Sequence, residues 1–415
     1  MEAPTKKPNI KLPEGMELVW NSVTGRWAMR PVPGYSTIYL DKNSFIPKST
    51  EERKEANKDK CAGKTKNGKL HKAKRDKNDE FYTRLEDITD ELKHYGREFF
   101  EGKVVYCPCD KAFNLGRSNF FTFFTSHFLD WGLKKLVATQ YVEGGRGWMW
   151  VIEKGDINGN GYIDESEIDT YQLTGNGDFL SEECRKIMDE SDVVVTNPPF
   201  SLFRPFVNQL VELNKKFLII GNQNAITYKE IFPLIKENKV WLGYHNNATY
   251  IFESPNGNIL ESNREYVKAH GLDPDKYIKV PSVCWFTNLE HNKRKEDLYL
   301  GNTYFGHESE YPKYDNYNAI EVSKVANIPV DYNGVMGVPI TFLGQYNPEQ
   351  FEIVGCADAD ILPDGWSGMT SEFVELYYKQ GNTGQYKEGN RLTHYVSPEG
   401  KAIVPFKRIL IRRKK

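Results

Sequence analysis

The sequence predicts an α/β fold, in which a mostly parallel β-sheet is covered by helices on both faces. Two observations predict it. Short, continuously apolar runs at residues 104–107, 136–138, 192–196 and 217–220 are typical of strands buried on both faces. Segments with helical spacing of apolar residues separate these runs, at residues 85–100, 118–132 and 203–214. Ligands of such sheets bind at the carboxyl ends of the strands, where we look for chemistry.

The bulk composition limits the classes of protein. The chain has 415 residues, enough for two lobes, and its 39% hydrophobic and 13% aromatic content can support a large core. A net charge of −2 does not by itself indicate a nucleic-acid partner. No two of the six cysteines have CxxC spacing, so neither a zinc ribbon nor a disulfide scaffold is indicated. We expect a cytoplasmic protein, because no signal peptide or membrane-length apolar run is found.

The first 77 residues differ from the rest. Trp20 and Trp27 flank residues 21–26, which predict a hairpin turn within a small β appendage. Residues 48–77 are rich in Lys and Arg and contain almost no large apolar side chain. We interpret them as a solvated linker, an interpretation compatible with a basic arm that follows phosphates.

The chain beyond residue 245 gives weaker patterns. Residues 280–287 predict a strand, and residues 304–343, rich in Tyr, Asn, Gly and Pro, predict long ordered loops. The end of the chain, residues 406–415, predicts a short strand with a basic tail.

The strongest motif is Asn197-Pro198-Pro199-Phe200, directly after the best strand candidate. Two prolines stiffen the loop. Its polar groups suit methylation of an amine conjugated to a ring, whose lone pair is delocalised. Acceptors at the Asn197 side-chain carbonyl and the Pro198 backbone carbonyl would hold the two amine N–H groups and free the lone pair, and Phe200 would stack on the base. The alternative is a plain turn, since Asn and Pro are good turn formers.

Two further segments carry polar residues that could bind a ligand. Asp178-Phe179 precedes a helix and can hold an adenine ring, although Asp also caps helices. Asp110 follows the first strand, and Ser118-Asn119 opens the next helix. The glycine-rich motif that usually marks a nucleotide-cofactor site is absent, so the assignment of a cofactor site to Asp110, Ser118 and Asn119 is indirect.

Several segments together resemble the EcoRI-type adenine-specific DNA methyltransferases. They occur in the expected order between about residues 78 and 355, and comprise residues 79–83, 107–110, 118–121, 175–179, 193–203, 217–232, 311–317 and 336–343. The resemblance implies a Rossmann-like class I S-adenosylmethionine-dependent methyltransferase sheet with added N-terminal and C-terminal recognition regions. The predicted division is residues 1–77 as appendage and linker, 78–300 as catalytic domain with an insertion at about 143–175, and 301–415 as target-recognition region.

The resemblance also implies site roles. The catalytic loop is Asn197 to Phe200, and an adenine flipped out of duplex DNA is the acceptor. The residues expected to bind S-adenosylmethionine are Phe81, Tyr82, Thr83, Cys109, Asp110, Ser118, Asn119, Asp178, Phe179 and Asn197. One departure concerns the ribose, since the second strand ends in Ala138-Thr139-Gln140-Tyr141 without the acid that many methyltransferases place there.

Candidate DNA contacts are weaker, because each has an ordinary surface role as its alternative. They are Asn222, Asn224, Tyr228, Arg264, Lys293, Arg294 and the basic C-terminal residues 412–415. We expect a monomer that acts on double-stranded DNA and does not bind a cognate restriction endonuclease directly. Two other readings stay open: methylation of an RNA base or a protein glutamine, and a non-catalytic DNA-binding protein on the same fold.

Residues 156–167 match the calcium loop of an EF-hand. Asp156, Asn158, Asn160, Asp164 and Glu167 stand at ligand positions 1, 3, 5, 9 and 12, and Gly161 is at position 6. A strand-like segment precedes the loop instead of a helix, and no second loop follows. The sequence predicts no catalytic metal and leaves open a structural Ca²⁺ or a stiff Asn/Gly-rich turn.

Overall fold

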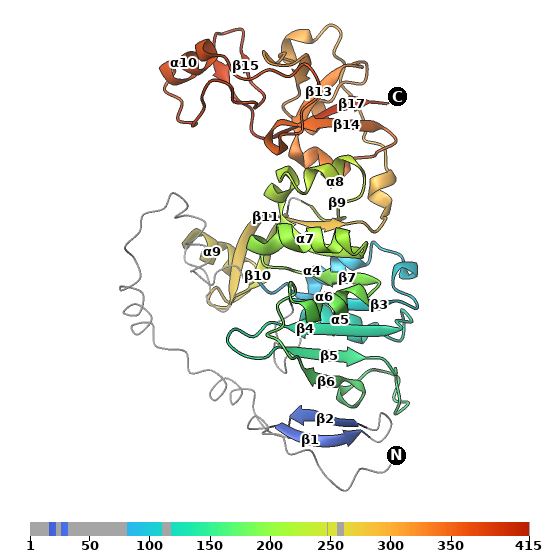
Figure 1. Ribbon diagram of the computed structural model, residues 1–415. Coiled ribbons are helices and arrows are strands. Elements are labelled where there is room, and N and C mark those ends of the chain that lie inside the picture. Colours follow the sequence, from blue (N-terminus) through green and yellow to red (C-terminus); the bar gives the residue numbers. More distant parts are fainter. Residues whose placement is uncertain are drawn as a thin grey trace, which may run out of the picture. The chain divides into compact units, whose positions relative to one another are not determined.

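The computed structural model describes residues 16–21, 26–31, 81–109, 118–246, 248–254 and 261–414 (Figure 1). The chain forms two compact units. The first comprises Met1–Thr89, Arg97–Ser201 and Phe252–Ile278, and the second comprises Asp90–Gly96, Leu202–Ile251 and Lys279–Lys415. Within the described residues, no helix is long and apolar enough to cross a membrane.

The first unit contains three of the four predicted strands and two more. In sheet order they are β7 (Val193–Thr196), β3 (Val104–Cys107), β4 (Lys135–Gln140), β5 (Trp148–Ile152) and β6 (Asp169–Gln172). β3 runs parallel to both β4 and β7, whereas β5 and β6 pair antiparallel. The carboxyl ends of β3, β4 and β7 therefore share one edge of the sheet.

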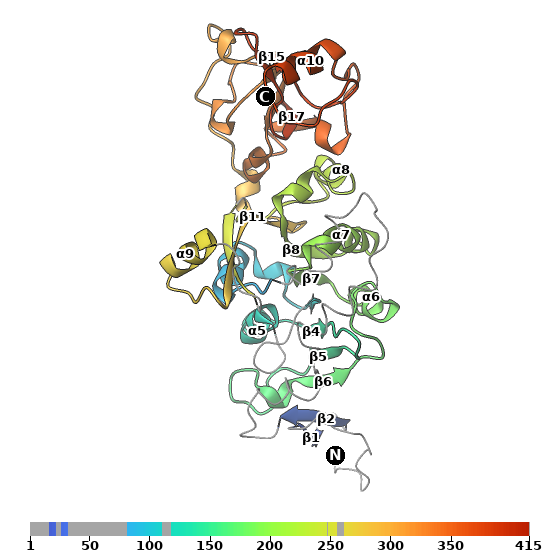
Figure 2. The same cartoon turned by 90° about the vertical axis from the view of Figure 1, so that its left-hand side faces the viewer.

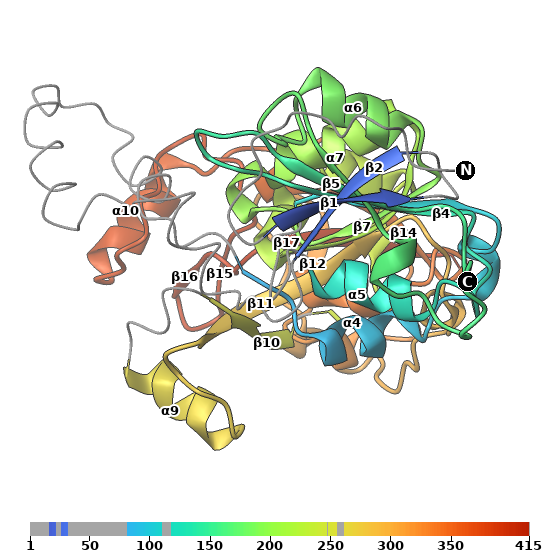
Figure 3. The ribbon, with the colours of Figure 1, turned by 90° about the horizontal axis from the view of Figure 1, so that it is seen from below.

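Helices cover both faces of this sheet, as predicted. α5 (Asn119–Ser126) and α6 (Glu182–Asp189) lie on opposite faces (Figures 2 and 3). α5 buries four phenylalanines, and the Ser118 hydroxyl caps it by accepting the Phe121 N–H at 3.1 Å. The helix ends at Ser126, before the predicted stop at Gly132, because tighter turn bonds such as Phe128 N–H to Thr125 O replace the helical ladder.

Two other predicted elements of this part of the chain are present. β1 (Met16–Asn21) and β2 (Arg26–Pro31) form an antiparallel hairpin with Trp20 and Trp27 paired in register, as the turn pattern predicted. The predicted helix over residues 85–100 is shorter: α4 (Leu85–Leu92) is followed by a turn and a 3-10 helix at Arg97–Phe99. The basic segment of residues 48–77 lies outside the described residues.

The second unit contains α7 (Phe203–Glu212), β8 (Lys216–Asn222), β9 (Trp241–Leu242) and most of β10 (Ala248–Glu253) and β11 (Tyr277–Thr287). β11 pairs antiparallel with both β8 and β9. At β8 a side chain on Gly221 would lie 2.5 Å from the ring of Phe203, so glycine permits helix and strand to pack closely. A 3-10 helix, η5 (Gln223–Thr227), and α8 (Phe232–Lys236) follow β8.

A separate four-stranded sheet lies further along the second unit. Its order is β12 (Ala319–Glu321), β13 (Val335–Pro339), β17 (Arg408–Arg413) and β14 (Phe351–Cys356). The predicted C-terminal strand is present as β17, and it is central, not peripheral, with Ile409, Leu410 and Ile411 fully buried. β13 falls within the segment predicted as loops. The strand was missed because Gly337 and Pro339 have low strand propensity.

Candidate active site

Asn197 begins the loop that follows β7, and its side chain is held in one orientation. Its amide nitrogen donates to the backbone oxygen of Phe81 at 2.8 Å and to the hydroxyl of Thr83 at 3.2 Å. Both partners accept hydrogen bonds from the amide nitrogen and so fix the orientation of the amide. The Asn197 side-chain oxygen therefore remains available to accept a hydrogen bond from a ligand. The orientation of the amide is the one that the predicted acceptor role would require.

Residues 81–83 are themselves held in place by hydrogen bonds. Tyr82 pairs with Glu253 through both backbone bonds, at 3.0 and 2.9 Å. The Asn119 amide donates to the Thr83 carbonyl at 2.7 Å. Thr83 is 3% exposed. The structure therefore brings together three of the predicted segments, those around Thr83, Asn119 and Asn197.

Aromatic rings flank the loop. The ring of Phe81 lies 5.6 Å from that of Phe200, tilted by 59°, and 5.6 Å from that of Phe252. Phe200 keeps an intermediate exposure, so part of its face is accessible. This arrangement suits stacking on a flat ring.

A hydrogen bond connects the carboxyl end of β7 with the residue that follows β3. The Thr196 hydroxyl donates to the Pro108 backbone oxygen. Cys109 follows with a left-handed backbone, φ 62°, at the point where the chain leaves β3. The next residue, Asp110, lies outside the described residues. Of the predicted pair at the start of α5, Ser118 caps the helix with its hydroxyl, and Asn119 holds Thr83.

Asp178 and Phe179 lie beside the carboxyl end of β4. Gly177 has φ +81°, and a side chain there would come within 2.1 Å of the Gln140 backbone oxygen, so only glycine fits this approach. Asp178 Oδ1 accepts the Leu180 N–H at 2.9 Å, and Phe179 is 5% exposed. The acid–aromatic pair thus shares the sheet edge with Asn197. β4 itself ends in Gln140, without an acid.

The predicted DNA contacts after β8 have structural partners. Asn222 caps η5 by accepting the Asn224 N–H at 2.9 Å. Asn224 is exposed, and its oxygen accepts from Lys407 at 3.0 Å. The guanidinium of Arg204 lies 4.2 Å from the centre of the Tyr228 ring.

Four of the predicted cationic contacts have partners within the protein. Arg264 pairs with Asp275 at 2.7 Å, and Arg412 pairs with Glu352 at 3.5 Å. Lys293 donates to the Tyr244 backbone oxygen at 2.9 Å. The Arg294 side chain is 9% exposed and bonds to Glu290 and Asn238, with its guanidinium 3.9 Å from the centre of the Trp241 ring. A phosphate would have to compete with these partners.

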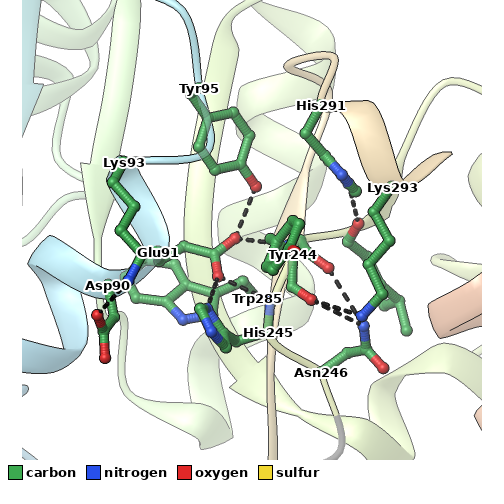
Figure 4. A network of polar contacts seen from close by, with 12 residues as sticks. Asp90, Glu91, Lys93, Tyr95, Tyr244, His245, Asn246, Trp285, His291 and Lys293 are labelled. Atoms are coloured by element: carbon green, nitrogen blue, oxygen red, sulfur yellow. Dashed lines mark hydrogen bonds and ion pairs between the residues drawn. The ribbon is translucent and has the colours of Figure 1, made fainter. Parts of the chain in front are cut away.

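Sequence reasoning missed a buried carboxylate in the second unit. Glu91 is fully buried and accepts the Tyr95 hydroxyl at 2.7 Å, the backbone N–H groups of Tyr244 and His245 at 2.7 and 2.8 Å, and a ring N–H of His245 at 2.9 Å (Figure 4). Burial raises the pKa of Tyr95 well above its usual value. The signal was present, because Glu91 stands three residues after Ile88 on the apolar face of α4.

The loop at residues 156–167 is closed by its own side chains. Asp156 accepts backbone N–H groups of Gly159 and Gly161 at 2.7 and 2.8 Å. Glu167, 5% exposed, accepts the Asp164 N–H at 2.8 Å, and hydrogen bonds from Ser166 lower the pKa of Asp164 to about 2. Within the described residues, no three His, Cys, Asp or Glu side chains are grouped to hold a metal ion.

The fold and the loop at this sheet edge define a class of protein, the α/β methyltransferases. The family described as adenine-specific methyltransferase EcoRI matches residues 69–414. The chain is 48% identical over 297 residues to the Escherichia coli type II methyltransferase M.EcoRI, covering 69% of this chain and 88% of the relative. It is 42% identical over 292 residues to M.MpnI of Mycoplasma pneumoniae, covering 69% and 85%. It is 37% identical over 332 residues to M.MgeORF184P of Mycoplasma genitalium, covering 79% and 96%.

The chain therefore belongs to the EcoRI family of adenine-specific methyltransferases. It is an enzyme that methylates adenine in DNA, and the family implies S-adenosylmethionine as methyl donor. The expected resemblance and the Rossmann-like fold are confirmed. Family membership excludes the two alternative functions, methylation of an RNA base or a protein glutamine and a non-catalytic DNA-binding protein. No solved structure matched the chain.

Proposed function

We propose that the loop Asn197 to Phe200 catalyses methyl transfer to the N6 amine of an adenine flipped out of duplex DNA. The observation that carries this proposal is the fixed amide of Asn197, whose nitrogen is held by Phe81 and Thr83. An acceptor that is oriented before the substrate arrives loses no hydrogen bond and little entropy when the amine binds.

The mechanism follows from the positions of these groups. The Asn197 side-chain oxygen and the Pro198 backbone oxygen each accept one N–H of the amine. Accepting both draws the nitrogen toward tetrahedral geometry and frees its lone pair for attack. Phe200 stacks on the adenine ring. S-adenosylmethionine supplies an electrophilic methyl group on a sulfonium. No strong base is required, because the proton leaves the amine after the new bond has formed.

The cofactor would lie at the shared edge of β3, β4 and β7. Asp178 uses Oδ1 for the Leu180 N–H. Its Oδ2 can accept from the amine of the cofactor's adenine, and Phe179 would contact the ring. The proposed cofactor contacts also include Phe81, Tyr82, Thr83, Cys109, Asp110, Ser118, Asn119 and Asn197. The closely fitted Gly177 supports this placement, because it lets the acid reach the edge.

Two substitutions separate the two roles. Asn197→Ala should lower methyl transfer by about a hundredfold or more, because a preorganised electrostatic contact is lost. Its affinity for S-adenosylmethionine should stay within about threefold of the wild type, because the side-chain oxygen of Asn197 is assigned to the substrate amine and the residue makes at most a minor contact with the cofactor. A lost cofactor contact worth about 1.4 kcal/mol would change that affinity tenfold. Asp178→Ala should instead weaken the cofactor by about tenfold or more, because hydrogen bonds to charged groups contribute about 1.5–3 kcal/mol. Calorimetric titration and a tritium-transfer assay measure both; an active Asn197→Ala enzyme would contradict the proposal.

The remaining regions are assigned on charge and family resemblance. Residues 1–77 would be an appendage and basic arm, and residues 301–415 the region that recognises the DNA target. The exposed Asn224 and the polar residues Asn222 and Tyr228 are proposed DNA contacts, with Arg264, Lys293 and Arg294 as the weaker candidates. We propose a cytoplasmic monomer that does not bind a restriction endonuclease directly.

We also propose that the loop at residues 156–167 binds a structural Ca²⁺. The spacing of its oxygen-bearing side chains and Gly161 at the turn support this. Calcium at millimolar concentration should raise the melting temperature by about 2 °C or more through binding to the folded state. Methyl transfer should not require it. Differential scanning fluorimetry with chelator and re-added calcium tests this, with Asp156→Asn as a control that should lose the response. A melting curve unchanged by both treatments removes the proposal.

A further inference from the structure

The segment that orients Asn197 has little regular structure of its own. Phe81, Thr83 and Arg84 lie in irregular backbone, and Tyr82 forms an isolated β-bridge. The backbone oxygen of Phe81 nevertheless holds the Asn197 amide nitrogen at 2.8 Å. An irregular segment can hold a reacting group in one position only if neighbouring elements fix it.

The end of β10 fixes the backbone of this segment. Glu253, the last residue of β10, exchanges two backbone hydrogen bonds with Tyr82, at 3.0 and 2.9 Å. The next residue, Ser254, is 5% exposed, and its N–H donates to the Lys276 backbone oxygen at 2.8 Å. All these residues belong to the same compact unit as the loop at Asn197. The bridge therefore restrains the backbone directly beside Phe81.

Phe252, one residue before Glu253, adds a contact between side chains. Its ring is fully buried and lies 5.6 Å from that of Phe81, with an interplanar angle of 28°. The half-buried Phe81 also places its ring 5.6 Å from that of Phe200. Paired aromatic rings have preferred geometries, so each ring restricts the position of its neighbour. Phe252 thus packs on a residue that contacts the catalytic loop both through its backbone oxygen and through its ring.

We propose that Phe252 is a positioning residue for methyl transfer and acts on Asn197 through Phe81. Its ring keeps the Phe81 oxygen where that oxygen accepts the Asn197 amide, so the amide stays turned toward the substrate. Phe252 is fully buried, and the role requires no contact with the substrate or the cofactor. The inference rests on the proposed role of Asn197 and adds a residue to it.

Replacing the ring with a smaller apolar side chain tests this role. Phe252→Leu keeps the position apolar but removes the stacked ring, so Phe81 gains freedom to move. Steady-state kinetics with S-adenosylmethionine and duplex DNA containing the target site should show a kcat about tenfold lower, because small errors in orientation lower the rate. The KM values for both substrates should stay within about threefold. An unchanged kcat, with or without a raised KM for S-adenosylmethionine, would overturn the proposal.

A matched variant separates positioning from a loss of stability. Phe100 is fully buried in the same compact unit, and its ring lies 5.5 Å from that of Phe124 and 5.1 Å from that of Trp131. Phe100→Leu should lower the melting temperature about as much as Phe252→Leu, yet keep kcat within about twofold of the wild type. Equal losses of kcat would show that Phe252 only supports the fold. Phe252→Met, which fills the space with a flexible chain, should show the same kinetic pattern as Phe252→Leu and replaces it if that variant does not fold.

A substitution at Asn197 tests whether the effect passes through the hydrogen bond to Phe81. In Asn197→Asp the carboxylate can still accept from the amine, but it has no N–H to donate to the Phe81 oxygen. Adding Phe252→Leu to this variant should therefore change kcat by about twofold or less, against about tenfold in the wild-type background. The same tenfold loss in both backgrounds would overturn the proposal. An Asn197→Ala enzyme as active as the wild type, measured in the same assay, would overturn the proposed function itself.

Discussion

At the scale of single residues, the site depends on how Asn197 is oriented. The sequence predicted Asn197 and its tetrapeptide, because an unusual motif follows an unmistakable buried strand. It could not predict that the Asn197 amide bonds to the backbone oxygen of Phe81, which lies 116 positions away. Every residue type carries a backbone oxygen, so the sequence does not mark this contact. Thr83 was predicted as a cofactor contact, and in the structure its hydroxyl accepts from the Asn197 amide.

Thr83→Val tests this orienting role. Valine keeps the shape of the buried side chain and removes the acceptor, so kcat should fall roughly three- to tenfold, the effect of a hydrogen bond worth about 0.5–1.5 kcal/mol. The KM for S-adenosylmethionine should change little. The control is Thr122→Val, which removes a hydroxyl on α5 that bonds to the Ser118 backbone oxygen and does not contact Asn197. A raised KM with unchanged kcat would instead make Thr83 a cofactor contact alone.

At the scale of elements, burial patterns were predicted better than long-range polar contacts. The strands β3, β4, β7 and β8 were predicted because each is continuously apolar. β13 was missed, since its glycine and proline are typical of loops. Glu91 was missed as a site because its donors at Tyr244 and His245 lie more than 150 residues along the chain.

The buried His291, near Glu91, predicts how the free energy of unfolding changes as the pH falls. His291 is 6% exposed, its Nε2 donates to the Leu242 backbone oxygen at 3.0 Å, and burial lowers its pKa below 6.5. Its neutral form is therefore favoured by folding, and the stability it contributes is lost as the pH falls below about 6.5, where the unfolded chain takes up the proton first.

The variant His291→Gln separates this effect from general acid sensitivity. Between pH 7.5 and 5.5 the wild type should lose more thermal stability than His291→Gln, by roughly 2 °C or more in melting temperature. His94 and His394 have lowered pKa values for the same reason, so the variant should keep part of the pH dependence. Parallel melting curves for the two proteins across this range would show that His291 does not titrate with folding.

At the scale of the whole molecule, the order of motifs along the chain predicted the family, and the relatives confirm it. The sequence could not predict that each compact unit is assembled from three separate segments. Such assembly depends on which distant strands and helices pack together, and apolar periodicity carries no record of that choice. The predicted roles of residues 1–77 and 301–415 stay predictions.

The central claim is that Asn197 directs adenine-N6 methylation at a defined DNA site. The most direct test expresses the chain in a host that lacks adenine methylation and sequences plasmid DNA with detection of N6-methyladenine. The wild type should produce N6-methyladenine at a single short sequence motif, and Asn197→Ala, present at an equal level and equally folded, should produce none. Methylation of cytosine, scattered methylation without a motif, or an unchanged pattern in Asn197→Ala would contradict the account.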